Sequence, residues 1–222
     1  MQHLRLCYSK LGAARFASHR DFSRAFERAL RRAGVPMAHS SGFSPHPRIS
    51  YADSAPTSAA SHAEYADIAV LEVLDPERVR EELNAALPVG FRVLRVVERR
   101  RPPLSELLQA SDWVIDLGEG RTPRLGRTVD ELLAARSVEV SRVTRKGERT
   151  FDARPAVRSA HVDEDGRVQV RLVHGAPLVR PDDVLRALRR LEPGLGGDHP
   201  GLFTRLRQGP LLPDGSIGDP LD

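Results

Sequence analysis

The sequence predicts an α+β protein built from two ferredoxin-like halves, in which split β-α-β motifs form antiparallel sheets. In the first half, alternating and helical segments follow one another in the order β-α-β-β-α-β. A similar pattern partly repeats after the charged, proline-bearing stretch ERRRPPLSE. We therefore expect a basic domain over residues 1–101, a second, divergent domain over residues 110–208, and a flexible tail over residues 209–222.

The first half contains two helices whose starts are marked by polar capping residues. Ser18 and Asp21 have the spacing of a capping box, and apolar residues then recur at helical intervals until Gly34. Asp75 followed by Pro76 indicates the start of the second helix, because proline is favoured at the first helical position. The extended segments are residues 3–9, 48–54, 64–74 and 91–100.

The second half has the same kinds of segment. Strands or extended stretches are predicted at residues 111–118, 137–145, 149–163, 167–175 and 202–212, and helices at residues 128–136 and 180–191. We expect a turn at Lys146–Gly147 and another at Asp165–Gly166, because glycine adopts the backbone angles that tight turns require.

Positive charge is concentrated near the start of the chain. The 222 residues carry 34 Lys and Arg against 30 Asp and Glu, a net charge of +4. Residues 1–50 alone hold nine basic and two acidic residues, a net charge of +7. Such a distribution is typical of a surface that binds a polyanion. Aromatic residues are only 5% of the chain, so few surfaces for stacking are expected.

The single cysteine and the hydropathy pattern exclude several classes of protein. Cys7 alone cannot form an internal disulfide or an all-cysteine metal cluster, and we expect it to be a buried free thiol. No apolar run approaches eighteen residues, and the first ten residues resemble a strand and not a signal sequence. We therefore expect a cytoplasmic protein with no membrane partner.

The first predicted helix carries a one-sided row of positive charge. Its arginines are Arg20, Arg24, Arg28, Arg31 and Arg32, and only Glu27 offsets them. Like charges at i, i+4 spacing destabilise a helix by about 0.2–0.5 kcal/mol per pair. One interpretation is a solvated face, or pairing with acidic residues of the second half. The other is a phosphate-binding ridge, in which Arg24, Arg28, Arg31 and Arg32 contact an RNA backbone.

The loop SSGFSPHPRIS at residues 40–50 follows this helix. Pro45 and Pro47 restrict the residues before them, so we expect a rigid, extended segment that presents its side chains to a ligand. The candidate RNA-binding residues of the loop are Gly42, Phe43, Ser44, His46 and Arg48. The alternative interpretation is a stiff connector with an exposed histidine.

Histidines are also frequent in the first part of the chain, at positions 3, 19, 39, 46 and 62. Their spacing, with Glu64 and Asp67, matches no tight metal-binding signature, so neither a metal nor any other cofactor is expected. His46 and His19 are the candidate general bases if the protein is catalytic. In the second half, Asp152 and Arg154 of FDARP form a possible second site, although a structural ion pair is favoured over catalysis.

The segment FASHRDFSRAFERALRRAGVPMAHSSGFSPHPRIS, with LNAALPVGFRV and FDARP further on, resembles the radical SAM-linked protein family. Members of that family are encoded beside, or fused to, B12-binding-type radical SAM proteins, often near genes for ribonuclease E/G and ribosomal proteins. A radical SAM enzyme needs three cysteines for its cluster, so this chain would be a companion and not the enzyme. The resemblance implies a tRNA or rRNA substrate and a B12-binding-type radical SAM partner.

The sequence is therefore interpreted as a non-enzymatic RNA-binding or substrate-presenting accessory protein that acts in tRNA or rRNA processing or modification. One alternative is a metal-independent ribonuclease or other RNA-processing enzyme that uses His46 or His19, with a neighbouring arginine stabilising the phosphate charge. Another is a scaffold that binds only a protein partner.

Overall fold

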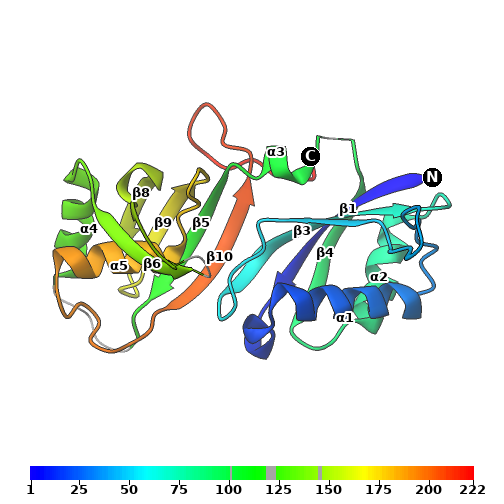
Figure 1. The fold of residues 1–222 in the computed structure, drawn as a ribbon, viewed down its shortest axis with the longest axis horizontal. Helices are drawn as coiled ribbons and strands as arrows, with labels where there is room; N and C mark the ends of the chain where they lie inside the picture. Colours follow the sequence, from blue (N-terminus) through cyan, green and yellow to red (C-terminus); the bar gives the residue numbers. More distant parts are fainter. Residues whose placement is uncertain (101, 119–123, 145–146) are drawn as a thin grey trace. The chain divides into compact units, whose positions relative to one another are not determined.

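The computed structural model describes residues 1–222 except 101, 119–123 and 145–146, and the chain divides into two units (Figure 1). Unit 1 comprises Met1–Leu108 and Gly218–Asp222, and unit 2 comprises Gln109–Ile217. In each unit, helices accompany strands that pair antiparallel. The predicted α+β class is therefore confirmed.

The described residues of unit 1 form four strands, and the named strand pairs are antiparallel. Its elements are β1 (Gln2–Lys10), η1 (Gly12–Phe16), α1 (His19–Arg32), β2 (Ile49–Ala52), β3 (Ala60–Val70), α2 (Pro76–Ala86), β4 (Phe91–Glu98) and α3 (Leu104–Leu107). Ile68 of β3 pairs with Leu4 of β1 and with Ile49 of β2. Because one residue has two partners, β1 and β2 lie on opposite edges of β3, and the order in this unit is β4-β1-β3-β2.

The local sequence explains where α1 begins and ends. The Ser18 hydroxyl accepts a hydrogen bond from the Asp21 amide at 3.2 Å, and the Asp21 carboxylate accepts one from the Ser18 amide at 3.1 Å. This is the predicted capping box. Gly34 follows the helix with a φ of +65°, a conformation that favours glycine.

The main core of unit 1 lies between its helices and one face of its sheet. Alternate strand residues contribute to it, such as Leu4 and Leu6 of β1 and Ile68 of β3. The helices contribute apolar residues at helical spacing, including Phe26 of α1 and Leu83 of α2. The side chains between these strand residues therefore point to the opposite face of the sheet, which α1 and α2 do not cover. We call it the helix-free face, although the short α3 packs on part of it.

A smaller core covers part of the helix-free face. Cys7 and Tyr65 pack there against Leu104 and Leu108 of the segment that the sequence predicts as a linker, and against Leu221. Unit 1 therefore extends to Leu108, beyond the predicted boundary at residue 101, because these leucines bury their side chains on the sheet.

The C-terminal segment also differs from the expected flexible tail after residue 208. Leu211 and Ile217 form a β-bridge, and residues 218–222 belong to unit 1. Leu221 is buried, and the carbonyl of Pro220 accepts a hydrogen bond from Arg5 at 3.1 Å. Burial of an apolar side chain and satisfaction of a buried donor both favour this ordered arrangement.

The described residues of unit 2 form a four-stranded antiparallel arrangement and a separate antiparallel pair of strands. Its elements are β5 (Ala110–Asp116), α4 (Leu125–Ala134), β6 (Glu139–Thr144), β7 (Gly147–Asp152), η2 (Arg154–Ala156), β8 (Val157–Val162), β9 (Val168–Val173), α5 (Pro181–Leu191) and β10 (Leu202–Gly209). The order is β10-β5-β9-β8, and β6 pairs with β7.

The predicted hairpin around Asp165–Gly166 is present between β8 and β9, and Gly166 has a φ of +79°. The single extended stretch predicted at residues 149–163 is instead divided by η2, because Pro155 lies in that turn and cannot donate a strand hydrogen bond. The other predicted turn includes Lys146, which lies outside the described residues.

Candidate functional site

The arginines of α1 form an exposed row opposite the buried face of the helix. All five of them are exposed: Arg20, Arg24, Arg28, Arg31 and Arg32. Phe22 and Phe26, on the other side, are buried in the main core of unit 1. We call these five residues the arginine row. The helical period places them on one solvent-facing side, as the sequence predicts.

The arginine row differs in its partners from six other arginines of unit 1. Ion pairs elsewhere in this unit join Arg5 and Arg99 to Asp67, Arg78 to Glu82, Arg80 to Glu77, Arg95 to Asp219, and Arg100 to Glu98. Among the described residues of unit 1, no member of the row forms an ion pair with a carboxylate. The charge of the row is therefore available to an external anion.

Aromatic contacts surround the start of α1. The ring of His19 meets the ring of Tyr51 edge to face, with their centroids 4.9 Å apart. Burial raises the pKa of the Tyr51 hydroxyl above its ordinary range. Hydrogen bonds from Ser18 hold the pKa of Asp21 below its ordinary range. His19 thus lies beside a neutral phenol and the helix cap.

The loop after α1 is closed by hydrogen bonds, and its Pro47 forms an antiparallel bridge with His39. The Ser40 amide donates to the His46 carbonyl at 2.9 Å, and the His46 amide donates to the Ser40 hydroxyl at 3.1 Å. Gly42, with a φ of +132°, lies within the closed loop. Phe43 is fully exposed, and Ser44 and His46 are exposed as well. The loop therefore presents an aromatic ring and an imidazole to solvent.

Arg48 lies apart from the arginine row. Ile49 and Tyr51 pack against the core beneath the helices. Because side chains alternate along a strand, Arg48 and Ser50 face the helix-free side. There Arg48 donates to the Met1 sulfur at 3.8 Å and lines a cavity of about 230 Å³. The structure thus separates Arg48 from the other predicted RNA-binding arginines.

His19 and His46 lie in different elements. His19 is the first residue of α1, and its ring meets that of Tyr51, whereas His46 belongs to the closed loop after α1. Each histidine therefore stays a separate candidate for the general base. The described residues also contain no group of three or more His, Cys, Asp or Glu side chains that could hold a metal ion.

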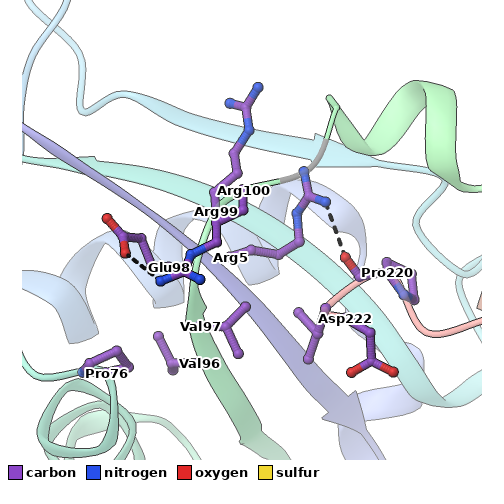
Figure 2. Close-up of a pocket in the computed structure, with 10 residues that line it drawn as sticks. Arg5, Pro76, Val96, Val97, Glu98, Arg99, Arg100, Pro220 and Asp222 are labelled. Carbon is purple, nitrogen blue, oxygen red and sulfur yellow. Dashed lines mark hydrogen bonds and ion pairs between the residues drawn. The ribbon is translucent and has the colours of Figure 1, made fainter.

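Sequence reasoning missed a buried charge network on the helix-free face. Arg5, only 1% exposed, donates to both oxygens of Asp67, at 2.7 Å from Nε and 2.9 Å from Nη2. Arg5 also donates to the carbonyl of Pro102 and to that of Pro220, and Figure 2 shows the second of these bonds. The available signal was the strand pattern, which places Arg5 on the face opposite Leu4 and Leu6. Pairing with Asp67 required knowledge of the register.

Asp152 and Arg154, the possible second site in unit 2, form hydrogen bonds with backbone groups. Asp152 accepts hydrogen bonds from the amides of Val138 at 2.8 Å and Arg154 at 3.0 Å. Burial raises the pKa of Asp152, but these donors outweigh it and lower the pKa. Arg154 donates to the carbonyls of Val157 and Leu133. The two side chains therefore hold backbone segments together and make no hydrogen bond to each other within the described part of unit 2.

A comparison with sequence families matches residues 3–181 to the family described as "Uncharacterized protein conserved in bacteria (DUF2344)". The chain belongs to this family. The DUF2344 region contains α1, the loop at residues 40–50 and Asp67, and it ends at the first residue of α5. No curated protein matches the chain. No helix of the described residues is long and apolar enough to cross a membrane.

Proposed function

We propose that this DUF2344 protein is a non-enzymatic accessory protein that binds RNA, either tRNA or rRNA, and presents it for processing or modification. The observation that carries the proposal is the arginine row of α1. Five exposed guanidinium groups share one side of a helix, and no described carboxylate of unit 1 forms an ion pair with them, although Asp21 interacts electrostatically with Arg20 and Arg24. Repulsion between these arginines destabilises the helix less when an external polyanion neutralises their positive charges.

The dimensions of α1 suit contact with several phosphates. Arg24 and Arg31 are seven residues apart, which corresponds to about 10 Å along the helix axis. The row is therefore long enough to contact more than one phosphate of an RNA strand. Phe43 and His46 in the following loop supply exposed rings for base stacking. Such contacts bind RNA with little sequence preference.

A role beside a B12-binding-type radical SAM protein is part of the same proposal. It is supported by the resemblance of residues 16–50 to the radical SAM-linked family. The cysteine content agrees with it, because a chain with one cysteine cannot hold a cluster that needs three and would have to act beside the enzyme. Cys7 is the single cysteine, and burial raises the pKa of its thiol to about 12, which makes it a poor ligand. A complex of the two proteins on size-exclusion chromatography is the expected result.

We also infer that both units are ferredoxin-like. The strand order is β4-β1-β3-β2 in unit 1 and β10-β5-β9-β8 in unit 2. If β6 and β7 are treated as an insertion, each unit has its fourth strand beside its first, then its third, then its second. Ferredoxin-like folds host many unrelated functions, so this inference supports no particular activity.

RNA binding is tested by its salt dependence. We expect the affinity for tRNA and rRNA fragments to fall steeply as salt increases, because bound arginines release counterions from the phosphates. The double variant Arg24→Ala with Arg28→Ala should reduce the slope of log K against log salt by about two units, roughly one per lost contact. Filter binding or fluorescence anisotropy across a salt series measures this slope.

The matched control replaces two exposed helical arginines that already have carboxylate partners, Arg78→Ala with Arg127→Ala. These substitutions should leave the slope unchanged. Salt-insensitive binding, or an equal effect of both double variants, would contradict the proposal. Cleaved RNA after long incubation with the purified protein would contradict the non-enzymatic role and favour the ribonuclease alternative.

A further inference from the structure

We propose that the helix-free face of unit 1 binds a small organic phosphate, with its phosphate group held by Arg48 and Arg99. The site is the cavity of about 230 Å³ that Arg48 lines. Its polar lining residues are His3, Arg48, Ser50, Asp67 and Arg99. We call it the phosphate cavity. This inference does not depend on RNA binding, because the arginine row lies on the helical side of the sheet.

Several strands bring polar groups to the phosphate cavity. His3 comes from β1, Ser50 from β2 and Asp67 from β3. Arg99 follows β4, and its amide donates to the carbonyl of His3 at 2.8 Å. These positions are distant in sequence, and the sheet register brings them together. A cavity with convergent polar groups on a rigid sheet is the usual form of a small-molecule site.

The charges of the network favour an anion. The guanidinium groups of Arg5, Arg48 and Arg99 accompany the single carboxylate of Asp67, which gives three positive charges against one negative, a net charge of +2. Arg5 donates to both oxygens of Asp67. The Nε atom of Arg99 lies 3.5 Å from Oδ2 of Asp67, and this ion pair positions the Arg99 guanidinium at the cavity. Arginine binds phosphate oxygens with two parallel hydrogen bonds, so two arginines suit a phosphate dianion.

A larger cavity of about 720 Å³ shares Arg99 with the phosphate cavity (Figure 2). Val96, Val97 and Leu221 give it apolar walls. Arg100 also lines this cavity, and its Nη2 atom lies 3.6 Å from Oε2 of Glu98. The charge of Arg100 is therefore partly balanced within the protein. We assign the organic part of the ligand to this cavity. Burial of apolar ligand surface should then add to the affinity that the phosphate group provides.

Isothermal titration calorimetry of the full chain at constant ionic strength tests the site with three probes: phenyl phosphate, inorganic phosphate and phenol. We expect saturable 1:1 binding of phenyl phosphate, weaker binding of inorganic phosphate and no binding of phenol. Arg48→Gln and Arg99→Gln should each weaken phenyl phosphate binding about tenfold or more, because each removes hydrogen bonds to a charged group. Arg127→Gln, an exposed arginine of unit 2, should have no effect.

The variant Arg48→Gln decides the question if Arg99→Gln fails to fold, because the Arg48 side chain is exposed. The double variant of Arg24 and Arg28 should retain phenyl phosphate binding, which separates this site from the RNA surface. Absence of saturable phenyl phosphate binding overturns the proposal, and so does an unchanged affinity in Arg48→Gln. Displacement of phenyl phosphate by tRNA would show that the cavity belongs to the RNA surface and would also overturn it.

Discussion

At the scale of single residues, Arg5 and Asp67 show how a buried charge is accommodated. Asp67 is a strand residue with a 6% exposed side chain, and Arg5 satisfies both of its oxygens. Arg5 in turn uses backbone carbonyls from Pro102 and Pro220, so its remaining donors are not left in an apolar surrounding. A buried ion pair costs desolvation energy, which good geometry and further hydrogen bonds offset.

We predict that Asp67→Asn lowers the free energy of unfolding of unit 1 by about 3–5 kcal/mol, because it leaves the Arg5 guanidinium buried without a counter-charge. The two units have separate spectroscopic probes, since Tyr8, Tyr51 and Tyr65 are all in unit 1 and Trp113 is in unit 2. Urea unfolding followed by near-UV circular dichroism of tyrosine measures the loss. Glu72→Gln, at an exposed position, is the control, and equal stability of the two variants would disprove the prediction.

At the scale of elements, α1 combines a locally encoded helix with an exposed charged side. Its cap and its apolar spacing are properties of a few neighbouring residues, and they hold the helix on the sheet. The arginine row then occupies the side that remains. Repulsion within the row opposes helix formation, so the Ser18–Asp21 cap and the buried phenylalanines have to outweigh it.

Ser18→Ala should therefore lower the free energy of unfolding of unit 1 by about 0.5–2 kcal/mol, because it removes the acceptor for the Asp21 amide. High salt should reduce the loss of helix, since screening weakens the arginine repulsion. Thermal unfolding by far-UV circular dichroism at low and high salt measures both effects. Ser23→Ala within α1 is the control, because that hydroxyl donates to the His19 carbonyl and does not cap the helix. A loss in Ser23→Ala as large as in Ser18→Ala would argue against the cap.

At the scale of the whole molecule, each unit has an ion pair between its first and third strands, and the acidic and basic residues exchange strands between the two units. In unit 1, Arg5 on the first strand pairs with Asp67 on the third. In unit 2, Asp112 on β5 faces Arg171 on β9, and their closest atoms are 2.7 Å apart. Arg171 also donates to the carbonyl of Gly215, as Arg5 does to that of Pro220. The chain after β10 therefore supplies a backbone acceptor to each unit.

Removal of residues 218–222 should destabilise unit 1 while leaving unit 2 intact. The truncation exposes the surface that Leu221 covers and removes a carbonyl acceptor of buried Arg5, and we expect a loss of about 2–5 kcal/mol. The tyrosine signal should report a lower urea midpoint, and Trp113 fluorescence an unchanged one. Leu212→Ala, at a partly exposed position, is the matched control. A tyrosine midpoint that does not move would show that this segment contributes nothing to unit 1.

The sequence by itself determined the features that depend on neighbouring residues. The α+β class, the capping box at Ser18, the end of α1 near Gly34 and the hairpin at Asp165–Gly166 follow from local spacing and turn chemistry. The exposed arginine row was also predictable, because the helical period places its members on one side. Cys7 is buried and free, as expected for a single cysteine.

Only the tertiary structure decided which distant residues meet. It closed the loop between Ser40 and His46, placed Arg48 on the helix-free side, and paired Arg5 with Asp67 across 62 positions. It also packed the C-terminal residues on unit 1. The physical reason is that strand register and the burial of leucines outside regular strands depend on the whole fold, and local patterns contain no information about them.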